Sequence, residues 1–415
     1  MKSSKNKVNQ DYSWIVLLTG TFVVFGALGL GRYGYTMVLP LMQEELSLGN
    51  SHTGLLATVN LSGYLAFALI GGALASRFGI RLVASVGLFV AGLSMFLTGL
   101  AEGFFAIALW RGFTGLGSGA ANVAVMGLWA AWFSKNRRGF ASGIAVSGSS
   151  LGLIFTGLLV PWLINDYGIT AWRISWYIFG FIAMALSVIS LLLLRNDPLK
   201  DLRKAKPAVG NSADEKEKKR DDNINGALKG VYLSKTVWVI GLVYAAFGFS
   251  YIIYMTFFVK YLMGEHGYDS VAAGNLFMIM GWISVFCGII WGTLSDYIGR
   301  RNALIAIFLI HTVSFSLFAA GFSVYAFVIS ALLFGLSAWS IPAIMAAKCG
   351  DMLGSKMAPA ALGFITLFFG IGQAIGPLAG GYLADNTGSF VSSFILAATI
   401  AFLGAVGATL FLDKG

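Results

Sequence analysis

Apolar residues fill most of the chain in long runs, which short polar stretches separate. Each run has about the 20 residues that an α-helix needs to cross the hydrocarbon core of a bilayer, or somewhat more. The pattern therefore predicts twelve membrane-spanning helices. They are expected at residues 14–42, 52–76, 82–101, 104–133, 140–164, 171–194, 233–263, 270–294, 303–322, 325–346, 359–384 and 389–412.

One long polar stretch, residues 195–232, divides the twelve runs into six and six. It is rich in Lys, Arg, Asp, Glu and Asn and almost lacks large apolar residues, so it cannot bury a core of its own. We expect a solvated cytoplasmic linker. The predicted organisation is an N-terminal tail (1–13), a six-helix bundle (14–194), the charged linker (195–232) and a second six-helix bundle (233–412).

Composition supports a membrane protein. Hydrophobic residues make up 57% of the chain and charged residues 11%, whereas soluble domains carry about 25% charged residues. The net charge is +10. If the N-terminus is cytoplasmic, most Lys and Arg residues lie in cytoplasmic segments, which is the distribution that the positive-inside rule predicts. We therefore expect a multi-pass protein of the cell (inner) membrane with both termini cytoplasmic. Its environment is the lipid bilayer, and the positive charge does not indicate a nucleic-acid partner.

The two halves repeat each other at a constant offset. A segment that begins at Gly72 resembles one that begins at Gly292, 220 residues later, and the same offset pairs Thr36 with Thr256 and Gly115 with Gly335. A single offset over several helices indicates a duplication. It predicts an all-α fold of two six-helix halves related by a pseudo-two-fold axis.

The repeated segments carry the motif G-x-L-A-D-R-x-G-R-K/R, which is typical of the major facilitator superfamily. The chain resembles this superfamily over nearly its whole length. The second copy keeps the acidic residue as Asp296, but the first has Ser76 there. The resemblance implies alternating access by rocking of the halves, around a cavity lined mainly by helices 1, 4, 7 and 10. It also implies that the motif locks the cytoplasmic side, less firmly where Ser76 replaces Asp. The candidate gating residues are Gly72, Arg77, Arg81, Gly292, Asp296, Arg300 and Arg301.

Within the superfamily, Gly31-Arg32-Tyr33-Gly34-Tyr35, followed by Leu39-Pro40, resembles the first helix of the bacterial YbfB-like branch. The chain is also similar to monocarboxylate and organic-anion porters. The eighth run contains no arginine, however, so the arginine that those porters commonly use there has no counterpart.

Arg32 is the strongest candidate for binding a substrate, because it lies inside the first apolar run. A guanidinium near the centre of a spanning helix costs about 2.5–3.5 kcal/mol on insertion scales, so it normally faces a polar cavity or a partner. At α-helical spacing, Tyr35 and Thr36 share its face. A guanidinium beside hydroxyl groups suits a carboxylate. The alternative is a structural arginine that bonds backbone carbonyls at a helix break among the nearby glycines.

Other polar residues on cavity helices are weaker candidates. Arg111 matches the fourth-helix motif R-x-x-x-G-x-G, and its role is either substrate- or proton-linked or structural. Tyr251 and Tyr254 belong to an aromatic stripe on helix 7, where hydroxyl groups need partners. The remaining candidates for binding the substrate are Asn60, Tyr64, Asn122, Trp339 and Ser340.

No Asp or Glu lies in the middle of any run, so the buried charge is positive and favours an anionic substrate. The sequence lacks Walker, G-x-S-x-G and H-E-x-x-H motifs, and we expect no enzyme activity, catalytic residue, cofactor or metal. We predict a monomeric secondary transporter of a small organic anion, a mono- or dicarboxylate, coupled to protons by symport. The alternatives are anion/anion antiport, export of drugs or neutral solutes, and a non-transporting sensor or scaffold.

Overall fold

The computed structural model describes residues 2–133, 137–196 and 233–412. The helices of the first half are α1 (Lys2–Val24), the π-helix η1 (Phe25–Tyr33), α2 (Gly34–Glu45), α3 (Asn50–Phe78), α4 (Ile80–Leu100), α5 (Phe104–Met126), α6 (Trp129–Trp132), α7 (Arg138–Tyr167), the short η3 (Gly168–Thr170) and α8 (Ala171–Leu193). Those of the second half are α11 (Lys235–His266), α12 (Ser270–Ile298), α13 (Arg300–Ala320), α14 (Val324–Ser337), α15 (Ser340–Thr387) and α16 (Val391–Phe411).

The twelve-helix prediction is confirmed. In the described part of the chain, nine segments are long and apolar enough to cross a membrane, and one of them, Gly139–Leu193, contains both α7 and α8. The long helices α3 and α5 provide the other two crossings. Most of the predicted linker, residues 197–232, lies outside the described residues.

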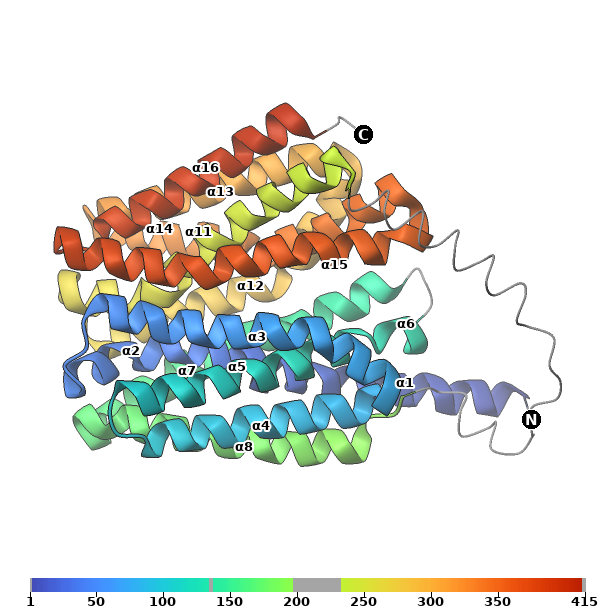
Figure 1. Ribbon diagram of the computed structural model, residues 1–415, viewed down its shortest axis with the longest axis horizontal. Helices are drawn as coiled ribbons and strands as arrows, with labels where there is room; N and C mark the ends of the chain where they lie inside the picture. The colour runs from blue at the N-terminus through green and yellow to red at the C-terminus, as the bar shows by residue number, and fades with distance from the viewer. Residues whose placement is uncertain (1, 134–136, 197–232, 413–415) are drawn as a thin grey trace.

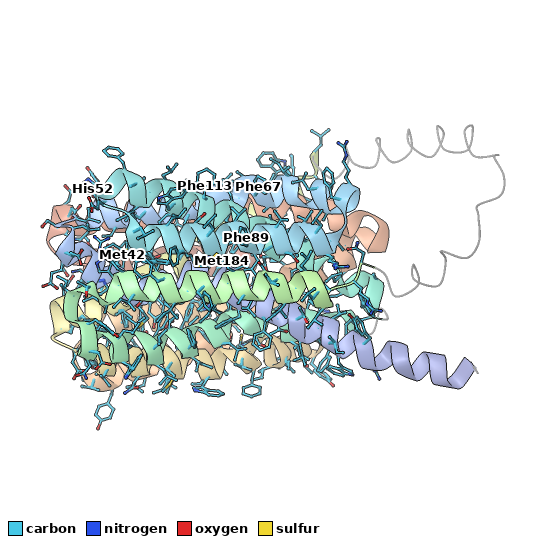
Figure 2. The ribbon with its side chains drawn as sticks, turned by 90° about the horizontal axis from the view of Figure 1, so that it is seen from below. Met42, His52, Phe67, Phe89, Phe113 and Met184 are labelled. Atoms are coloured by element: carbon cyan, nitrogen blue, oxygen red, sulfur yellow. The ribbon has the colours of Figure 1, made fainter. Side chains whose placement is uncertain are left out.

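The helices form two bundles that lie side by side (Figure 1). The first half contains α1 to α8 and the second half contains α11 to α16, and both ends of the chain lie at the same end of the molecule. We call this end the termini side and the opposite end the far side. Large apolar side chains such as Phe89 and Phe113 are exposed on the outer surface of the first half (Figure 2). A bilayer is the solvent that such a surface requires.

The duplication is visible in the helix contacts. A Cβ atom on Gly115 of α5 would collide with the carbonyl oxygen of Asn60 on α3. In the second half, a Cβ on Gly335 would lie 2.9 Å from the carbonyl oxygen of Met280. Both members of the second pair are 220 residues beyond those of the first, so the two halves repeat the same close crossing.

The contacts between the halves follow the same symmetry. Gly54 of α3 packs against the carbonyl of Pro377 on α15, and a Cβ atom on Gly274 of α12 would lie 2.5 Å from the carbonyl oxygen of Gly157 on α7. The offset of 220 exchanges these two contacts. Both lie on the far side, where glycine allows the backbones to approach closely.

The halves separate toward the termini side. At that end of α7 and α12, a Cβ on Gly143, Gly288 or Gly292 would meet no described atom within 4 Å. On the far side of the same helices, Gly157 and Gly274 are in backbone contact. The structure is therefore closed on the far side and open toward the termini.

Candidate functional site

The first membrane segment contains a π-helical turn where the sequence places Arg32. Within η1, the N–H of Gly34 is bonded to the carbonyl of Gly29, five residues earlier. A π-helical turn leaves carbonyl groups exposed on the helix, and such turns are frequent at functional sites. Two side chains of α5 reach these carbonyls: Ser118 Oγ donates to Ala27 O at 2.8 Å, and Arg111 Nη1 donates to Gly31 O at 2.8 Å.

Arg111 is enclosed by protein. Its side chain is 1% exposed, and its guanidinium carbon lies 4.6 Å from the ring centroid of Tyr35 and 5.1 Å from that of Trp176. Its own carbonyl accepts a hydrogen bond from Asn60 Nδ2 at 3.0 Å. These contacts favour the structural one of the two roles that the sequence left open for Arg111.

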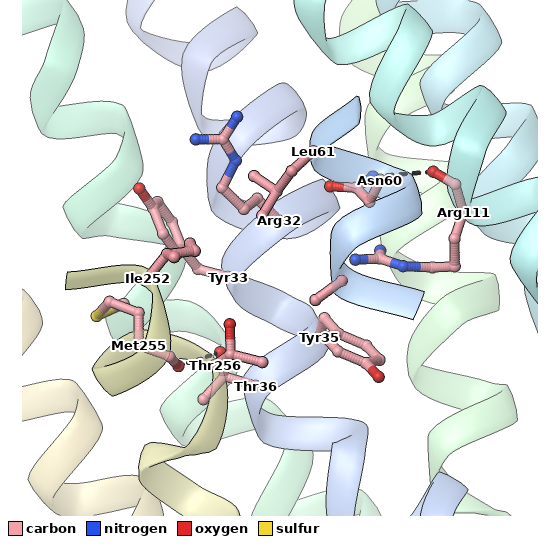
Figure 3. Close-up of a pocket in the computed structure, with 11 residues that line it drawn as sticks. Arg32, Tyr33, Tyr35, Thr36, Asn60, Leu61, Arg111, Ile252, Met255 and Thr256 are labelled. Carbon is pink, nitrogen blue, oxygen red and sulfur yellow. Dashed lines mark hydrogen bonds between the residues drawn. The ribbon is translucent and has the colours of Figure 1, made fainter. Parts of the chain in front are cut away.

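Arg32 has a different environment. Its guanidinium lies over the ring of Tyr64, 4.3 Å from the centroid, and its Nη2 atom is buried without a hydrogen-bond partner. In the part of the chain that the structure describes, no carboxylate forms an ion pair with it. Figure 3 shows the guanidinium directed away from Tyr35 and Thr36. Arg32 thus carries a charge that no described residue neutralises.

Tyr64 is held in place by Asn122. The amide nitrogen of Asn122 donates to the Tyr64 hydroxyl at 2.8 Å, which fixes the ring beneath the Arg32 guanidinium. A cation over an aromatic face is stabilised by about 0.5–2 kcal/mol. The sequence predicted that both residues bind the substrate directly. In this structure, Tyr64 instead packs against the Arg32 guanidinium and Asn122 holds Tyr64 in place.

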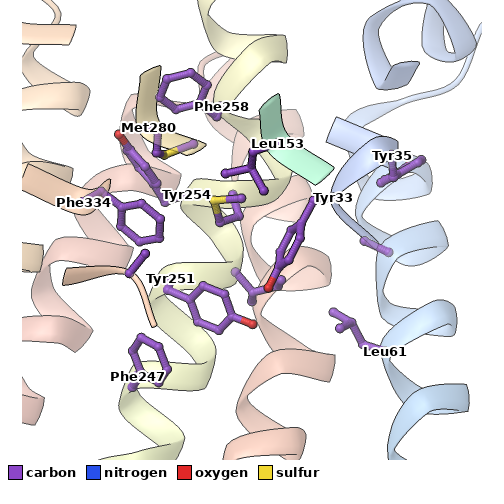
Figure 4. Packing of buried hydrophobic residues seen from close by; sticks show 14 of the residues in the cluster. Tyr33, Tyr35, Leu61, Leu153, Phe247, Tyr251, Tyr254, Phe258, Met280 and Phe334 are labelled. Carbon is purple, nitrogen blue, oxygen red and sulfur yellow. The ribbon is translucent and has the colours of Figure 1, made fainter. Parts of the chain in front are cut away.

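The second half contributes a polar chain to the same region. Tyr251 on α11 bonds with Gln373 on α15, and the Tyr33 and Tyr251 side chains lie near the Arg32 guanidinium. Figure 4 shows these two hydroxyl groups directed toward each other. Tyr33 and Gln373 were not among the candidate site residues. Tyr33 follows Arg32 directly, and α-helical geometry would turn it away.

Trp339 joins the two halves at this level. It lies at the break between α14 and α15, where its indole Nε1 donates to Ser150 of α7 at 3.0 Å. Its ring packs on Tyr33, with centroids 5.2 Å apart. The neighbouring Ser340 donates instead to the carbonyl of Cys287, at 3.2 Å, and is fully buried. The structure thus brings Trp339 to the Arg32 region and leaves Ser340 in helix packing.

Three other candidate hydroxyls have partners within the protein. Tyr35 donates to Thr53 O at 2.8 Å, and Thr36 donates across the halves to Met255 O at 2.7 Å. Tyr254 shares a 2.8 Å hydrogen bond with Ser330, inside the aromatic core of the second half (Figure 4). The α-helical spacing predicted one hydroxyl-lined face around Arg32, but these hydroxyls are directed to other groups.

A small cavity lies on the far side of Arg32. Its volume is about 10 Å³, about enough for one water molecule. Arg32, Tyr33, Tyr35, Thr36, Ala57, Asn60, Leu61, Arg111, Ile252, Met255 and Thr256 line it. It cannot hold an organic anion in this state. Because the halves separate toward the termini, a solute would reach Arg32 from the termini side.

The candidate gating residues of the second half form bonds within that half. Arg300 pairs with Asp296, at 2.5 Å, and with Asp351 of α15, at 3.2 Å. Arg301 donates to the carbonyls of Ala408 and Thr409. A Cβ on Gly292 would meet open space.

In the first half, Arg81 donates from its backbone N–H to Asn196 Oδ1, at 2.8 Å, and from Nε to Leu191 O, at 2.5 Å. The guanidinium of Arg77 lies 5.3 Å from the ring centroid of Phe78. Gly72 lies within α3, and the side chain of Ser76 lies outside the described residues. In both halves, the arginines of the motif therefore contact residues of their own half.

The comparisons with known proteins agree with this architecture. The family model described as "Uncharacterised MFS-type transporter YbfB" matches residues 24–409. The chain belongs to this family. The Bacillus subtilis hexuronate transporter is 24% identical over 397 residues, covering 92% of this chain and 91% of its own length. The probable sulfoacetate transporter SauU of Cupriavidus necator is 24% identical, with 92% and 90% covered. Human monocarboxylate transporter 6 is 24% identical, with 97% and 82% covered.

Solved structures share the fold of this MFS-type transporter. A bacterial homologue of the lysosomal transporter Spinster, in an inward-facing and unoccupied conformation, matches with a TM-score of 0.70 at 17% identity, covering 96% of this chain and 95% of that one. The nucleoside transporter NupG matches with a TM-score of 0.73 at 12% identity, covering 96% and 100%. At these identities the likeness concerns the fold alone.

Proposed function

We propose that this protein is a secondary transporter that moves a small organic anion, a mono- or dicarboxylate, by alternating access, and that Arg32 binds the carboxylate. The observation that carries this proposal is the unpartnered, buried Nη2 atom of Arg32. Leaving a buried hydrogen-bonding group unpaired costs about 1–3 kcal/mol, and more for a charged one. A carboxylate that accepts from Arg32 removes this cost.

The side chains around Arg32 offer mainly hydrogen-bond donors, which supports an anionic rather than a cationic substrate. A guanidinium has only donors, and a tyrosine hydroxyl can donate once. The Tyr251 oxygen accepts from Gln373, so we infer that its hydroxyl donates its hydrogen to a bound carboxylate. We infer that the carboxylate accepts from Arg32 together with Tyr33 and Tyr251, so that both halves would hold it.

The relatives support the same class of solute. Hexuronate, sulfoacetate and monocarboxylates, from which three relatives take their names, all carry a carboxylate. The site in this chain has a guanidinium on the first helix. A cavity with a positive charge and no described carboxylate disfavours lipophilic cations, which are typical substrates of multidrug exporters.

Proton symport is the coupling that we propose. Carrying one negative charge against a membrane potential of 100 mV costs about 2.3 kcal/mol, and a proton carried with the anion removes this cost for uptake. Anion/anion exchange would remove it too. The charge distribution further supports termini on the cytoplasmic side.

Uptake into proteoliposomes tests the proposal. The protein should accumulate labelled mono- or dicarboxylates when a pH gradient is imposed, and uptake should stop when an ionophore collapses the gradient. Uptake that instead requires a second anion inside the vesicles would establish exchange. If lipophilic cations or neutral solutes move and carboxylates do not, the anion proposal is wrong.

Tyr251 and Tyr254 form a matched pair of variants, because they lie on one helix but only Tyr251 faces Arg32. Tyr251→Phe is expected to raise the KM for the transported anion about tenfold, since it removes one donor to a charged group, worth about 1.5 kcal/mol. Tyr254→Phe removes a hydroxyl bonded to Ser330 and is expected to leave KM within about twofold. Initial uptake rates over a range of concentrations measure both. Equal effects of the two variants would show that Tyr251 does not bind the anion.

A further inference from the structure

Asp385 lies at the far-side end of α15 and bonds to the other half of the molecule. Its carboxylate accepts from the backbone N–H of Asn50 at 2.9 Å and from the backbone N–H of Ser51 at 2.7 Å. The Ser51 hydroxyl donates to the same carboxylate at 2.5 Å. Asn50 and Ser51 are the first residues of α3. One carboxylate of the second half thus satisfies three donors at the start of a helix of the first half.

These donors belong to a helix that lacks a cap of its own. The N-cap residue of α3 is Gly49, which has no side chain to accept a hydrogen bond. The corresponding residue of the second half, 220 positions later, is Asp269, and it caps its own helix α12 by accepting from the N–H of Ala272 at 2.7 Å. The two cap residues have nearly the same backbone conformation, with φ −69° and ψ 164° for Gly49 and φ −70° and ψ 167° for Asp269. The repeat therefore differs in the cap itself.

The asymmetry extends to the residue that supplies the cap. The counterpart of Asp385 in the first half is Asn165, whose amide is bonded to Asp166 of the same half. Carboxylates near a helix N-terminus are stabilised both by the free N–H groups and by the helix dipole. Asp385 gains this stabilisation from the opposite half, because the helix N-terminus whose donors it accepts, at Asn50 and Ser51, belongs to α3 of the first half.

The contact between α3 and α15 around this cap indicates that the cap forms only in the state that is closed on the far side. Gly381 of α15 packs against the carbonyl of Asn50 without room for a Cβ atom, and Thr58 of α3 donates to Ala374 O at 2.7 Å. The contact between α3 and α15 thus runs from Thr58 to Asp385, toward the far side. Any movement that opens the far side must part these two helices and remove the cap from α3.

We propose that Asp385 is a latch, which caps α3 from the opposite half and thereby favours the state closed on the far side. When the halves part on that side, α3 loses its N-cap and Asp385 loses three donors. This inference rests on the alternating-access part of the proposed function, and it does not depend on the identity of the solute.

Distances between spin labels on the two halves test the latch. Phe105 and Tyr325 are 87% and 77% exposed near the far-side ends of α5 and α14, and Phe78 and Tyr297 are exposed at the termini side. Each pair is labelled through cysteines in full-length protein in nanodiscs, after the two native cysteines, which are buried, are replaced by serine. Asp385→Ala is expected to raise the ratio of far-side-open to far-side-closed molecules about fivefold, as expected for loss of a typical helix cap. The far-side distances lengthen and the termini-side distances shorten.

Two further variants separate the latch from a general loss of stability. Gly49→Asp combined with Asp385→Ala gives α3 a cap of its own, like that of α12, and should keep the open population while restoring the melting temperature. Asp166→Asn removes a far-side carboxylate whose hydrogen bond, among the described residues, is with Asn165 of its own half, and should change neither distance. Far-side distances in Asp385→Ala that match those of the unmodified chain would overturn the latch. The spin-label distances do not depend on which solute is carried. If the anion uptake assay fails but the distances respond to Asp385→Ala, only the proposed anionic substrate is rejected and the latch stands.

Discussion

Arg32→Gln is expected to reduce the kcat/KM of carboxylate uptake about 100-fold while the protein still folds. Two charge-assisted hydrogen bonds to a carboxylate together supply about 3 kcal/mol, and glutamine provides neither the charge nor the paired donors. Folding should survive because no described residue depends on the Arg32 guanidinium for an ion pair. Removing an unneutralised charge from a membrane helix also lowers the cost of burial.

Arg32→Lys is the matched variant. It retains the charge but not the planar pair of donors, so we expect a loss of about tenfold, intermediate between glutamine and arginine. Uptake in proteoliposomes, normalised to protein that elutes as a single species, gives both values. Carboxylate uptake by Arg32→Gln at the native rate would rule out Arg32 as the anion ligand.

The sequence was sufficient for the twelve helices and for their division into halves. Hydropathy determines the helices because a bilayer leaves no other way to satisfy the backbone. The offset of 220 predicted that the second half repeats the first, and the matched contacts of Gly115 and Gly335 show this repeat in the helix packing. The first membrane helix and the location of Arg32 inside it could be predicted from the local sequence alone, without tertiary contacts.

The partners of the polar side chains could not be predicted in the same way. A π-helical turn within η1 depends on groups from another helix, Arg111 and Ser118, which bond its carbonyls. Nothing in the local sequence beyond several glycines signals it. Likewise, the spacing that placed Tyr254 in the stripe with Tyr251 does not say that its hydroxyl is bonded to Ser330. The break before α15 that carries Trp339 onto Ser150 also depends on tertiary contacts.

Arg111 has contacts that favour a structural role over a role in binding the substrate, and its lysine variant distinguishes the two. If it serves the substrate through its charge, lysine should replace it well. If it is a structural element, lysine should fail, because an ammonium cannot lie flat between the rings of Tyr35 and Trp176 and still reach the Gly31 carbonyl. A guanidinium combines planarity, stacking and several fixed donors, and an ammonium does not.

We therefore expect Arg111→Lys and Arg111→Met to be nearly equally damaging. Each leaves the Gly31 carbonyl without its donor, at a cost of about 1–3 kcal/mol, and each loses the stacking on two rings, worth up to about 2 kcal/mol. Both variants should show lower melting temperatures in detergent and lose transport together with folded protein. A second measurement keeps the two roles apart: binding of the anion to whatever fraction remains folded should keep its native Kd. Native stability of Arg111→Lys with transport lost only in Arg111→Met would instead assign the Arg111 charge to the substrate.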